Sequence, residues 1–467
     1  MAPPPGTPEH PLRVAIVGSG PAGFYSAGHL LGAKDVTVEV DLFDRLPTPF
    51  GLVRAGVAPD HPKIKSVTRV YEKTAARPGF RFFGNVEVGS DLSHAELKGH
   101  YHAVIYAVGA ETDRSLDIEG EDLPGSWAAT EFVAWYNGHP DYRELDFDLS
   151  GRRAVVIGNG NVAMDVARML VLPRAELETT DIADHAIDPM AESGIEEVVI
   201  VGRRGPAQAA FTNPELRELG ELTDADVVVD PAEVELDDHS ARSIEAEGEI
   251  TPRRNVEILT GYSGREPSGR RRRVVLRFLR SPVEILGDGR VEAVKLVRNE
   301  LHHGGDGSLR PRATEEHETL EAGLVFRSIG YRGVRIEGVP FDDWKGAIPN
   351  EEGRVLDPSE QHAISGEYVV GWIKRGPSGV IGTNKRDAQE TVDHVLEDLA
   401  EGRLPEAADA DPGAIAALIA ERKPDFVGWT GWELIDAAEQ AAGAPLGRPR
   451  VKLTRVEEMV EVASGRR

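Results

Sequence analysis

Two segments of the chain share one pattern, in which a short apolar run leads into a glycine turn and then into a helical stretch. Residues 13–17 (RVAIV) precede GSGPAG at 18–23, and residues 153–157 (RAVVI) precede GNGNVA at 158–163. Runs of this kind, rich in β-branched residues, are typical of buried parallel strands. Strand and helix patterns alternate along the chain, so the sequence predicts α/β architecture with two doubly wound, mostly parallel sheets.

The remaining elements follow from the same patterns. Further strands are predicted at residues 36–43, 103–108, 197–201, 324–329 and 367–370. Helices are predicted at 162–172, 383–399, 414–422 and 432–442. The Gly-rich, charged segment 302–317 indicates a hairpin tip or an exposed loop.

Composition narrows the possible functions. The 467 residues predict two or three domains, and the net charge of −26 disfavours nucleic-acid binding because both surfaces would be negative. The absence of cysteine excludes disulfides, Cys-ligated iron–sulfur clusters and thiol chemistry. No apolar run approaches about 18 residues, so no membrane insertion is expected. Residues 1–11 are expected to be a disordered tail without a leader pattern, which favours a cytoplasmic protein.

The first glycine turn has the residues that a dinucleotide needs. Gly18 allows a tight turn, Gly20 a close approach of the pyrophosphate, and Gly23 close helix–strand packing. The helix that follows supplies N–H donors and a positive end. Asp44 ends the next predicted strand, where a carboxylate binds the two hydroxyls of a ribose. A solvated turn acid is the simpler alternative for this residue.

The second glycine turn is followed by different residues. Ala163 replaces the third glycine, which the dinucleotide fingerprint permits. Arg203 and Arg204 follow the next predicted strand, where they suit a 2′-phosphate and therefore favour NADP(H) over NAD(H). An exposed basic turn is the alternative for this pair. The long interval between the glycine turn and this arginine pair predicts an extended helix or an insertion at about 173–194.

Two nucleotide units with opposite charge preferences predict a flavin site and a nicotinamide site on one chain. Longer strings are more specific: PFGLVRAGVAPDHPKIK from Pro49, GNGNVAMDVAR from Gly158, VGRRGPAQAAFT from Val201, and GWIKRGPSGVIGTNK from Gly371. With these strings the chain closely resembles the adrenodoxin reductase-type family of ferredoxin–NADP(+) reductases, including its bacterial members. The resemblance runs from about residue 12 to residue 399 and is expected to extend into the C-terminal helices.

The resemblance implies two Rossmann-like domains and their cofactors. The FAD-binding domain would be discontinuous, at 12–112 and 331–467, and the NADP-binding domain would span 113–330. FAD contacts are implied at Ala22, Asp44, Leu52, Val88, Trp372, Gly379, Val380 and Ile381. Contacts with NADP(H) are implied at Asn159, Gly160, Asn161, Val162, Arg203, Arg204, Glu215 and Gly379, with a further phosphate contact at Arg114. A helix that starts near Thr383 would aim its N-terminus at the flavin, with Asn384 as its N-cap.

Two catalytic residues are implied near the contact between flavin and nicotinamide. They are His61, within Asp60-His61-Pro62, and Glu218, which would share a helix face with Glu215. Hydride transfer needs no acid or base on the donor carbon, so these groups would orient the carboxamide or handle a proton at flavin N5. Its sequence neighbours alone indicate only a turn residue at His61.

The implied activity is FAD-mediated electron transfer from NADPH to ferredoxin, with cytochrome P450 systems as a familiar destination. Because the chain has no cysteine, the iron–sulfur cluster must belong to a partner protein. Flavoprotein disulfide reductases and the glutamate synthase small subunit have similar glycine turns but need cysteines, which excludes both. A non-catalytic FAD/NADP-binding redox sensor stays open as an alternative.

The resemblance also implies a monomer that docks an acidic ferredoxin. Such a partner needs a positive face on a chain that is negative overall. The candidate cations are those at 374–375, at 385–386, at 217 and at 270–273.

Overall fold

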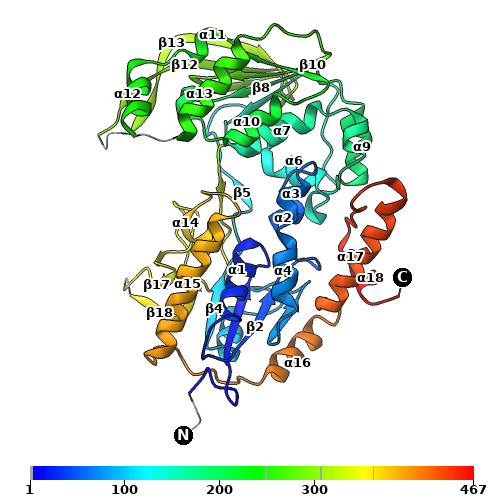
Figure 1. Cartoon of the computed structure of the whole chain (residues 1–467), viewed down its shortest axis with the longest axis vertical. Coiled ribbons are helices and arrows are strands. Elements are labelled where there is room, and N and C mark those ends of the chain that lie inside the picture. Colours follow the sequence, from blue (N-terminus) through cyan, green and yellow to red (C-terminus); the bar gives the residue numbers. More distant parts are fainter. Residues whose placement is uncertain (1–3, 248–249, 306–307, 361, 467) are drawn as a thin grey trace. The chain divides into compact units, whose positions relative to one another are not determined.

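The computed structural model describes residues 4–247, 250–305, 308–360 and 362–466. The chain forms two compact units (Figure 1). Unit 1 contains Met1–Thr112, Asn137–Pro140 and Tyr331–Arg467, and unit 2 contains Asp113–Tyr136 and Asp141–Gly330. The chain passes between the units through two short strands that pair with each other, β5 (Thr112–Asp113) and β15 (Tyr331–Arg332).

Unit 1 is built on a seven-stranded sheet with the order β16-β17-β18-β4-β1-β2-β3. Its strands are β1 (Leu12–Val17), β2 (Val38–Phe43), β3 (Phe80–Phe83), β4 (Ala103–Tyr106), β16 (Asn350–Glu351), β17 (Arg354–Leu356) and β18 (Ala363–Val369). The strands from β18 to β3 are parallel, and β1 lies between β2 and β4. The predicted fold class is confirmed for this unit.

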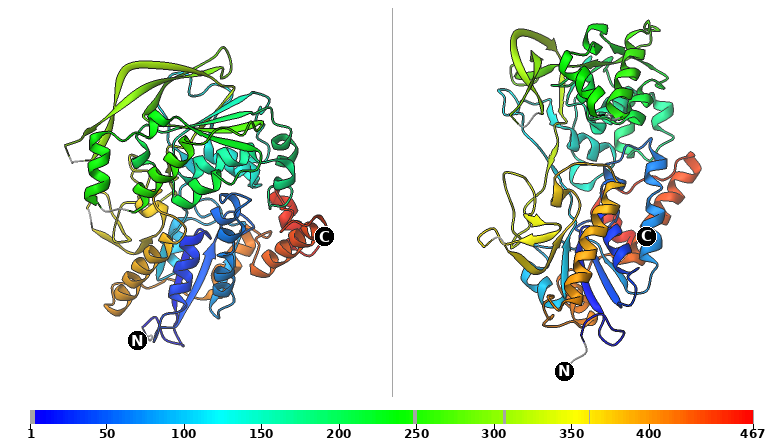
Figure 2. Two further views of the ribbon diagram at one scale, coloured as in Figure 1. Left: turned by 45° about the horizontal axis from the view of Figure 1, so that its top comes forward. Right: turned by 60° about the vertical axis from the view of Figure 1, so that its left-hand side comes forward.

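Helices cover both faces of this sheet. Val14 and Ile16 of β1 pack in one core with α1 (Pro21–Leu30) and α15 (Thr383–Ala400), which lie side by side (Figures 1 and 2). Ala15 and Val17 pack in a second core. Because both faces are covered, the strand is apolar at consecutive positions. The other helices of the unit are α2 (Leu52–Ala55), α3 (Pro62–Lys65), α4 (Thr68–Ala75), α5 (His94–His100), α14 (Trp372–Arg375), α16 (Pro412–Arg422), α17 (Trp429–Gly443) and α18 (Val456–Ala463).

Unit 2 is built on a six-stranded parallel sheet with the order β6-β14-β7-β8-β10-β9. Its strands are β6 (Ser126–Ala128), β7 (Arg153–Ile157), β8 (Glu197–Val201), β9 (Ala225–Val229), β10 (Arg272–Arg277) and β14 (Leu324–Arg327). Its helices are α6 (Ala129–Tyr136), α7 (Asn161–Val171), α8 (Arg174–Leu177), α9 (Asp184–Ala191), α10 (Asn213–Leu219), α11 (Pro231–Val234), α12 (Asp238–Glu247) and α13 (Ile250–Ser263). Among the described helices of the chain, none is both long and apolar enough to span a lipid bilayer.

The two faces of the unit 2 sheet are covered differently. Ala154 and Val156 pack against the helical side, in one core with residues of α6 and α7. Val155 and Ile157 pack against a three-stranded antiparallel sheet of β11 (Arg280–Leu286), β12 (Ala293–His303) and β13 (Leu309–Glu321). The long β12–β13 hairpin (Figure 2) contains most of the segment expected as a hairpin tip or loop, of which residues 306–307 lie outside the described residues. The expected insertion at 173–194 contains α8 and α9.

The N-terminal segment is more ordered than expected. The N–H of Gly6 donates to His10 O at 2.8 Å, and the N–H of Thr37 donates to Gly6 O at 2.8 Å. The expectation of a disordered tail is therefore wrong for residues 4–11, because these backbone groups pair with each other and with the segment before β2. Residues 1–3 lie outside the described residues.

A short excursion of the chain returns to unit 1 at 137–140, which the sequence-based division did not anticipate. The ammonium of Lys452 donates to the carbonyl oxygen of Asn137 at 3.1 Å and to its Oδ1 at 3.2 Å. Lys452 is 5% exposed. The C-terminal segment therefore binds a backbone that is distant in sequence, which no local pattern reveals.

The C-terminal helices are anchored by a buried carboxylate. The side chain of Glu439 on α17 is fully buried and pairs with Arg54 of α2 at 2.5 Å and with Arg450 at 3.1 Å. Burial raises the pKa of Glu439, but the two guanidiniums outweigh it, and the net pKa is lowered. The ionised form is thus stabilised in the folded protein.

Replacing this carboxylate should destabilise unit 1. We expect Glu439→Gln to lower the unfolding free energy at neutral pH by about 3 kcal/mol, because two guanidiniums lose their counter-charge. A carboxylate whose pKa is lowered by folding stabilises the folded state at pH values above its unfolded-state pKa. This stabilisation is lost as the pH falls through the folded-state pKa. The difference between variant and wild type should therefore shrink in acid. Denaturant unfolding at neutral and acidic pH measures this difference in unfolding free energy. The control is Glu457→Gln, on the exposed surface of α18, which should change the unfolding free energy little.

Candidate functional site

The first glycine turn joins β1 to α1 at the carboxyl edge of the unit 1 sheet. Gly18 has a φ of 106°, and a Cβ there would lie 2.5 Å from Ala107 O, just beyond β4. Only glycine combines this conformation with such a close backbone neighbour. The N–H of Gly18 donates to Phe43 O at 2.8 Å, at the end of β2. The turn is thus held by the strands on both sides of β1.

The next glycine of the turn borders open space. Among the described residues no heavy atom lies within 4 Å of the position that a Cβ on Gly20 would take, and its φ of −76° suits any residue. Gly20 is also the N-cap of α1, where no side chain caps the helix. Open space beside uncapped N–H groups is the arrangement in which a pyrophosphate binds.

Asp44 lies beside this turn, as the sequence predicts. Its Oδ2 accepts the N–H of Ser19 at 3.0 Å and the hydroxyl of Ser19 at 2.5 Å. Its Oδ1 accepts the N–H of Leu46 at 2.9 Å. Burial raises the pKa of Asp44, while these hydrogen bonds oppose the shift. A small cavity lined by Asp44, Gly51, Arg54 and residues 137–140 opens next to it.

The predicted residues Leu52 and Val88 differ in their setting. The N–H of Phe50 donates to Ser19 O at 3.0 Å, so the segment that leads into Leu52 and α2 lies against the glycine turn. Val88 is half-buried against the second core, together with Val108 beyond the end of β4. In the described structure these two residues therefore border different sides of the strand ends.

The C-terminal string returns to the same edge of the sheet, because β18 pairs with β4 in parallel. A Cβ on Gly371 would lie 2.8 Å from the Cβ of Ala22 on α1. Trp372 stacks on Tyr331, with ring centroids 5.4 Å apart and planes at 17°. The indole Nε1 of Trp372 is buried and has no hydrogen-bond partner among the described residues. An unpaired buried donor at this place fits a polar group of a bound ring.

The start of α15 corrects one prediction. Asn384 is not the N-cap: α15 begins at Thr383 behind Gly382, and Asn384 Oδ1 accepts a hydrogen bond from Arg375 Nη2 at 2.9 Å. The preceding loop determines this, since the carbonyls of 380–382 already accept the first N–H groups of the helix. The amides of Ile381 and Gly382 make no hydrogen bond within the described structure. Gly379 and Val380 are exposed, and Ile381 is half-buried.

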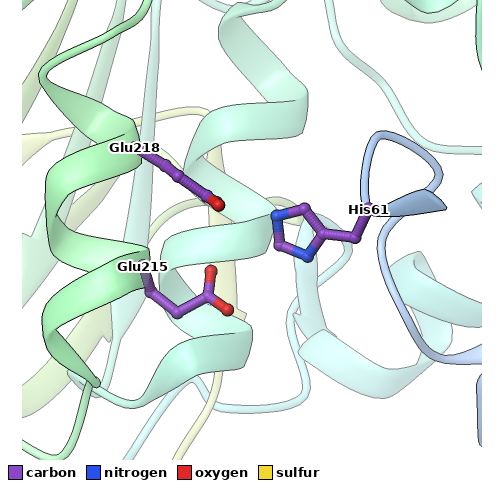
Figure 3. A group of neighbouring side chains, drawn as sticks. All are labelled: His61, Glu215 and Glu218. Atoms are coloured by element: carbon purple, nitrogen blue, oxygen red, sulfur yellow. The ribbon is translucent and has the colours of Figure 1, made fainter. Parts of the chain in front are cut away.

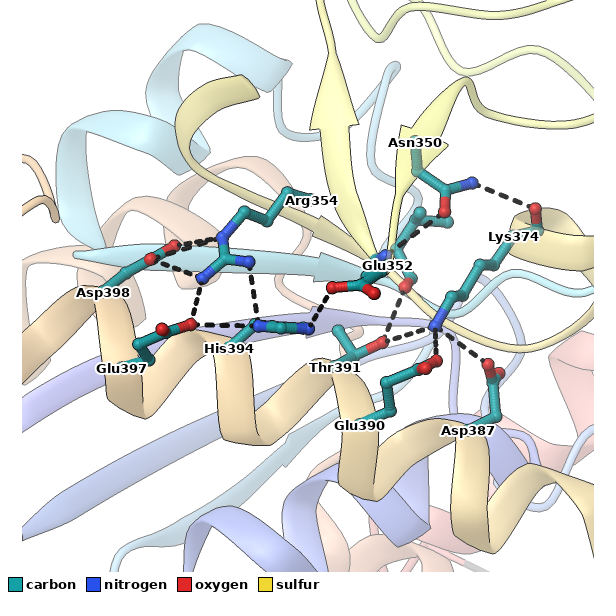
Figure 4. A network of polar contacts seen from close by, with 12 residues as sticks. Asn350, Glu352, Arg354, Lys374, Asp387, Glu390, Thr391, His394, Glu397 and Asp398 are labelled. Carbon is teal, nitrogen blue, oxygen red and sulfur yellow. Dashed lines mark hydrogen bonds and ion pairs between the residues drawn. The ribbon is translucent and has the colours of Figure 1, made fainter. Parts of the chain in front are cut away.

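Asp387 of α15 holds the turn that carries Trp372. Its Oδ2 accepts the N–H of Gly371 at 2.6 Å and Arg375 Nη1 at 2.8 Å, and its Oδ1 pairs with Lys374 Nζ at 3.1 Å (Figure 4). Asp387 is 8% exposed. Helix spacing does not predict these contacts, because the partners of Asp387 lie on a different turn of the chain.

The second glycine turn repeats this construction in unit 2. Gly158 has a φ of 124°, and a Cβ there would overlap Ser328 O, just beyond β14. Its N–H donates to Val201 O at 2.9 Å, at the end of β8. Gly160 is the uncapped N-cap of α7, and no described heavy atom lies within 4 Å of its Cβ position.

Two asparagines shape this turn. Asn161 Oδ1 accepts the N–H of Thr212 at 2.8 Å, which ties the start of α7 to the segment before α10. Asn159 Nδ2 is buried and has no partner among the described residues, so a donor is free for a ligand. Val162 is half-buried against the helical core.

The predicted phosphate-binding arginines follow β8. Arg203 is exposed, Arg204 is half-buried, and neither guanidinium has an ion pair within the described residues. Burial and, to a smaller extent, the neighbouring Arg203 lower the pKa of Arg204. Arg114 lies elsewhere in unit 2: it is exposed and follows β5, and its N–H donates to Gly330 O at 3.0 Å.

The predicted catalytic residues lie on short elements. Glu215 and Glu218 extend from the same side of α10 (Figure 3), and Arg168 Nη1 of α7 lies 3.5 Å from a carboxylate oxygen of each. Asp165 Oδ1 accepts Arg168 Nη2 at 2.7 Å. Arg168, whose side chain is 4% exposed, was missed, although it stands in the quoted string GNGNVAMDVAR. In unit 1, His61 is the buried N-cap residue of α3 (Figure 3).

Comparison with known proteins gives consistent matches. Residues 12–218 match the family described as "Pyridine nucleotide-disulphide oxidoreductase". "NADPH-ferredoxin reductase FprA" of Mycobacterium tuberculosis is 53% identical over 466 residues, which covers 97% of this chain and 100% of the relative. "NADPH:adrenodoxin oxidoreductase, mitochondrial" of Arabidopsis thaliana is 43% identical over 471 residues, covering 98% and 96%. The solved structure of Mycobacterium tuberculosis FprA in complex with NADPH has a TM-score of 0.92 at 52% identity and covers 98% of this chain and 100% of that one.

The chain belongs to the adrenodoxin reductase-type family of ferredoxin–NADP(+) reductases. The resemblance inferred from the sequence strings is confirmed. Disulphide reduction, which the matched description also names, needs a redox-active cysteine pair. The chain has no cysteine, so it shares the nucleotide-binding architecture and not the disulphide reaction.

The two glycines of the first turn should respond differently to the same substitution. Gly20→Ala should fold normally but retain at most about a tenth of the wild-type FAD, because the added methyl group occupies open space next to the α1 N-terminus. Gly18→Ala should lower the unfolding free energy by about 2 kcal/mol or more, because its Cβ meets a backbone carbonyl.

Flavin absorbance per protein and thermal unfolding measure the two effects. Gly99→Ala in α5 is the matched control, since its Cβ position is also open and its φ is not positive. Normal FAD content in Gly20→Ala would contradict the role of this space.

Proposed function

We propose that this protein is an FAD-dependent oxidoreductase that transfers electrons from NADPH to a ferredoxin. The observation that carries the proposal is the pair of open glycine turns, one beside the carboxylate of Asp44 and the other followed by the unpaired Arg203 and Arg204. Relatives over nearly the whole chain are named NADPH-ferredoxin reductase and NADPH:adrenodoxin oxidoreductase, which supports the same reaction here.

The residues of unit 1 fit FAD. The space at Gly20 and the uncapped start of α1 would take the pyrophosphate, and Asp44 would bind ribose hydroxyls. The free indole N–H of Trp372 and the unpaired amide of Ile381 would border the ring system. Ala22, Leu52, Val88, Gly379 and Val380 complete the proposed contacts. FAD, when bound, supplies the conversion between a two-electron donor and a one-electron acceptor.

The residues of unit 2 fit NADPH. Gly160 and the uncapped start of α7 would take the pyrophosphate, and the guanidiniums of Arg203 and Arg204 would bind the 2′-phosphate. The free amide of Asn159 would donate to the nucleotide. Asn161, Val162, Glu215 and Arg114 complete the proposed contacts.

Glu218 and His61 are proposed as residues that position the reacting groups. A carboxylate only accepts hydrogen bonds, so Glu218 would hold the amide nitrogen of the nicotinamide carboxamide. Arg168 Nη1 lies 3.5 Å from a carboxylate oxygen of each glutamate and would help to hold both side chains on one side of α10. His61 would accept the proton that N5 releases when the electrons pass on to the one-electron acceptor.

The electron acceptor is proposed to be a separate iron–sulfur protein. The chain has no cysteine and therefore no cysteine-ligated cluster of its own. A Mycobacterium bovis relative named "Probable ferredoxin/ferredoxin--NADP reductase" is 47% identical over 461 residues, and the match covers 76% of that relative. We also propose a cytoplasmic location, because NADPH is regenerated there.

Anaerobic titration tests this function. The purified protein should be yellow, and NADPH should bleach its flavin absorbance at far lower concentration than NADH. Catalytic amounts should then reduce a purified [2Fe–2S] ferredoxin with NADPH. A redox sensor would bind both nucleotides but reduce the ferredoxin no faster than free flavin does, which would refute the proposal.

The arginine pair should determine the choice of nucleotide. Arg203→Ala with Arg204→Ala should lower kcat/KM for NADPH about 100-fold, because two charge-assisted phosphate contacts are lost. The value for NADH, which lacks this phosphate, should change by less than about threefold.

Steady-state kinetics with a neutral quinone as acceptor measure both values. Arg271→Ala with Arg290→Ala, two exposed arginines of unit 2 without a described partner, is the control and should leave kcat/KM for NADPH unchanged. An unaltered NADPH preference in the first variant would remove the phosphate role from the pair.

A further inference from the structure

The candidate docking cations differ in their structural roles. The side chain of Lys374 is 7% exposed and pairs with Asp387 at 3.1 Å and with Glu390 at 2.6 Å (Figure 4). Arg375 pairs with the same Asp387 at 2.8 Å. In unit 2, Arg272 is 1% exposed. These cations stabilise the fold and are not available to a partner.

Lys385 and Arg386 are different. Both are exposed, and neither has an ion pair within the described residues. They stand in the first turns of α15, an 18-residue helix whose first turn contains no acidic residue. A helix N-terminus carries positive partial charge, so cations there destabilise the helix. Glu390, one turn further along, is already engaged by Lys374.

An exposed apolar side chain lies just before these cations. Val380, in the loop that leads into α15, is 54% exposed. The same loop contains Ile381, whose amide has no partner within the described residues. Lys385 and Arg386 therefore follow directly on the loop that is proposed to border the flavin, and exposed charges of this kind direct the encounter with a transient partner.

We propose that Lys385 and Arg386 form the docking surface for an acidic iron–sulfur carrier, an inference that rests on the proposed function. A chain with a net charge of −26 repels a negative partner, so a local cation pair has to provide the attraction. The electrons leave through the ring proposed to lie beside Trp372 and Ile381, and this surface belongs to the same loop and helix start. The two cations thus serve binding at the expense of helix stability.

Charge reversal tests the surface. Lys385→Glu with Arg386→Glu should raise the KM for an acidic [2Fe–2S] ferredoxin about tenfold at low ionic strength, and the difference from wild type should shrink as NaCl is added. The KM for NADPH and the rate of NADPH-driven reduction of a neutral quinone should stay within about twofold. Because glutamate is favoured at a helix N-terminus, the melting temperature should not fall.

The matched control is Arg69→Glu with Lys73→Glu on α4. These residues are also exposed cations of unit 1 without a described partner, and the change in net charge is identical. The control should keep the wild-type KM for ferredoxin. Equal KM values for ferredoxin in the two variants would overturn the docking surface. A raised KM for NADPH, with an unchanged KM for ferredoxin, would overturn it too and would assign the two cations to nucleotide binding. Failure of the wild type itself to reduce ferredoxin would refute the proposed function, which is a distinct result.

A second readout does not depend on turnover. A carbodiimide joins an amine directly to a carboxylate without a spacer, so it links groups that are in contact within a complex. Treatment of the holoenzyme with ferredoxin should therefore link Lys385 to a ferredoxin carboxylate. Peptide mass spectrometry identifies the linked residue. A link at Lys73 of equal yield, or none at Lys385, would overturn the proposal.

Discussion

The close backbone contact at each glycine turn is the constraint on which both candidate sites depend. Gly18 lies against the carbonyl of Ala107, and Gly158 lies against that of Ser328. In each unit the contacted residue follows the strand on one side of the central strand, and the helix leads to the strand on the other side. This is the topological switch point of a doubly wound sheet, where ligands bind. A side chain at either glycine would clash with that carbonyl oxygen and force the turn or the neighbouring strand end to shift.

Unit 1 depends in addition on a part of the chain that is distant in sequence. β18 pairs with β4 in the sheet. This pairing places Gly371 in contact with Ala22 on α1. Asp387 then ties the following turn to α15 through one backbone and two side-chain contacts. The turn that carries Trp372 is therefore held by a buried carboxylate, and the site is formed by both ends of the chain together.

Electrostatics divide the basic residues into two groups. Lys374 and Arg375 are neutralised by buried or neighbouring carboxylates and maintain the structure. Arg203 and Arg204 have no such partner in the described structure, and burial together with the neighbouring Arg203 lowers the pKa of Arg204. Which cations have a partner cannot be read from sequence adjacency alone.

Local patterns determined much of this protein. The strands at 13–17, 153–157 and 197–201 and the two glycine turns were predicted correctly, because backbone conformation and strand burial depend on residues that are neighbours in sequence. Asp44 directly follows β2, and its contact with a ribose stays a prediction. The N-cap role of Asn384 was wrong, because Arg375 from a separate turn binds that side chain.

Contacts between distant residues were decided only by the tertiary structure. They include the return of residues 137–140 to unit 1 through Lys452, and the engagement of Glu215 and Glu218 by Arg168. The tertiary structure also decides which cations have an ion-pair partner. The physical reason is that an ion pair or a buried hydrogen bond depends on distance in space, and folding sets that distance independently of separation along the chain.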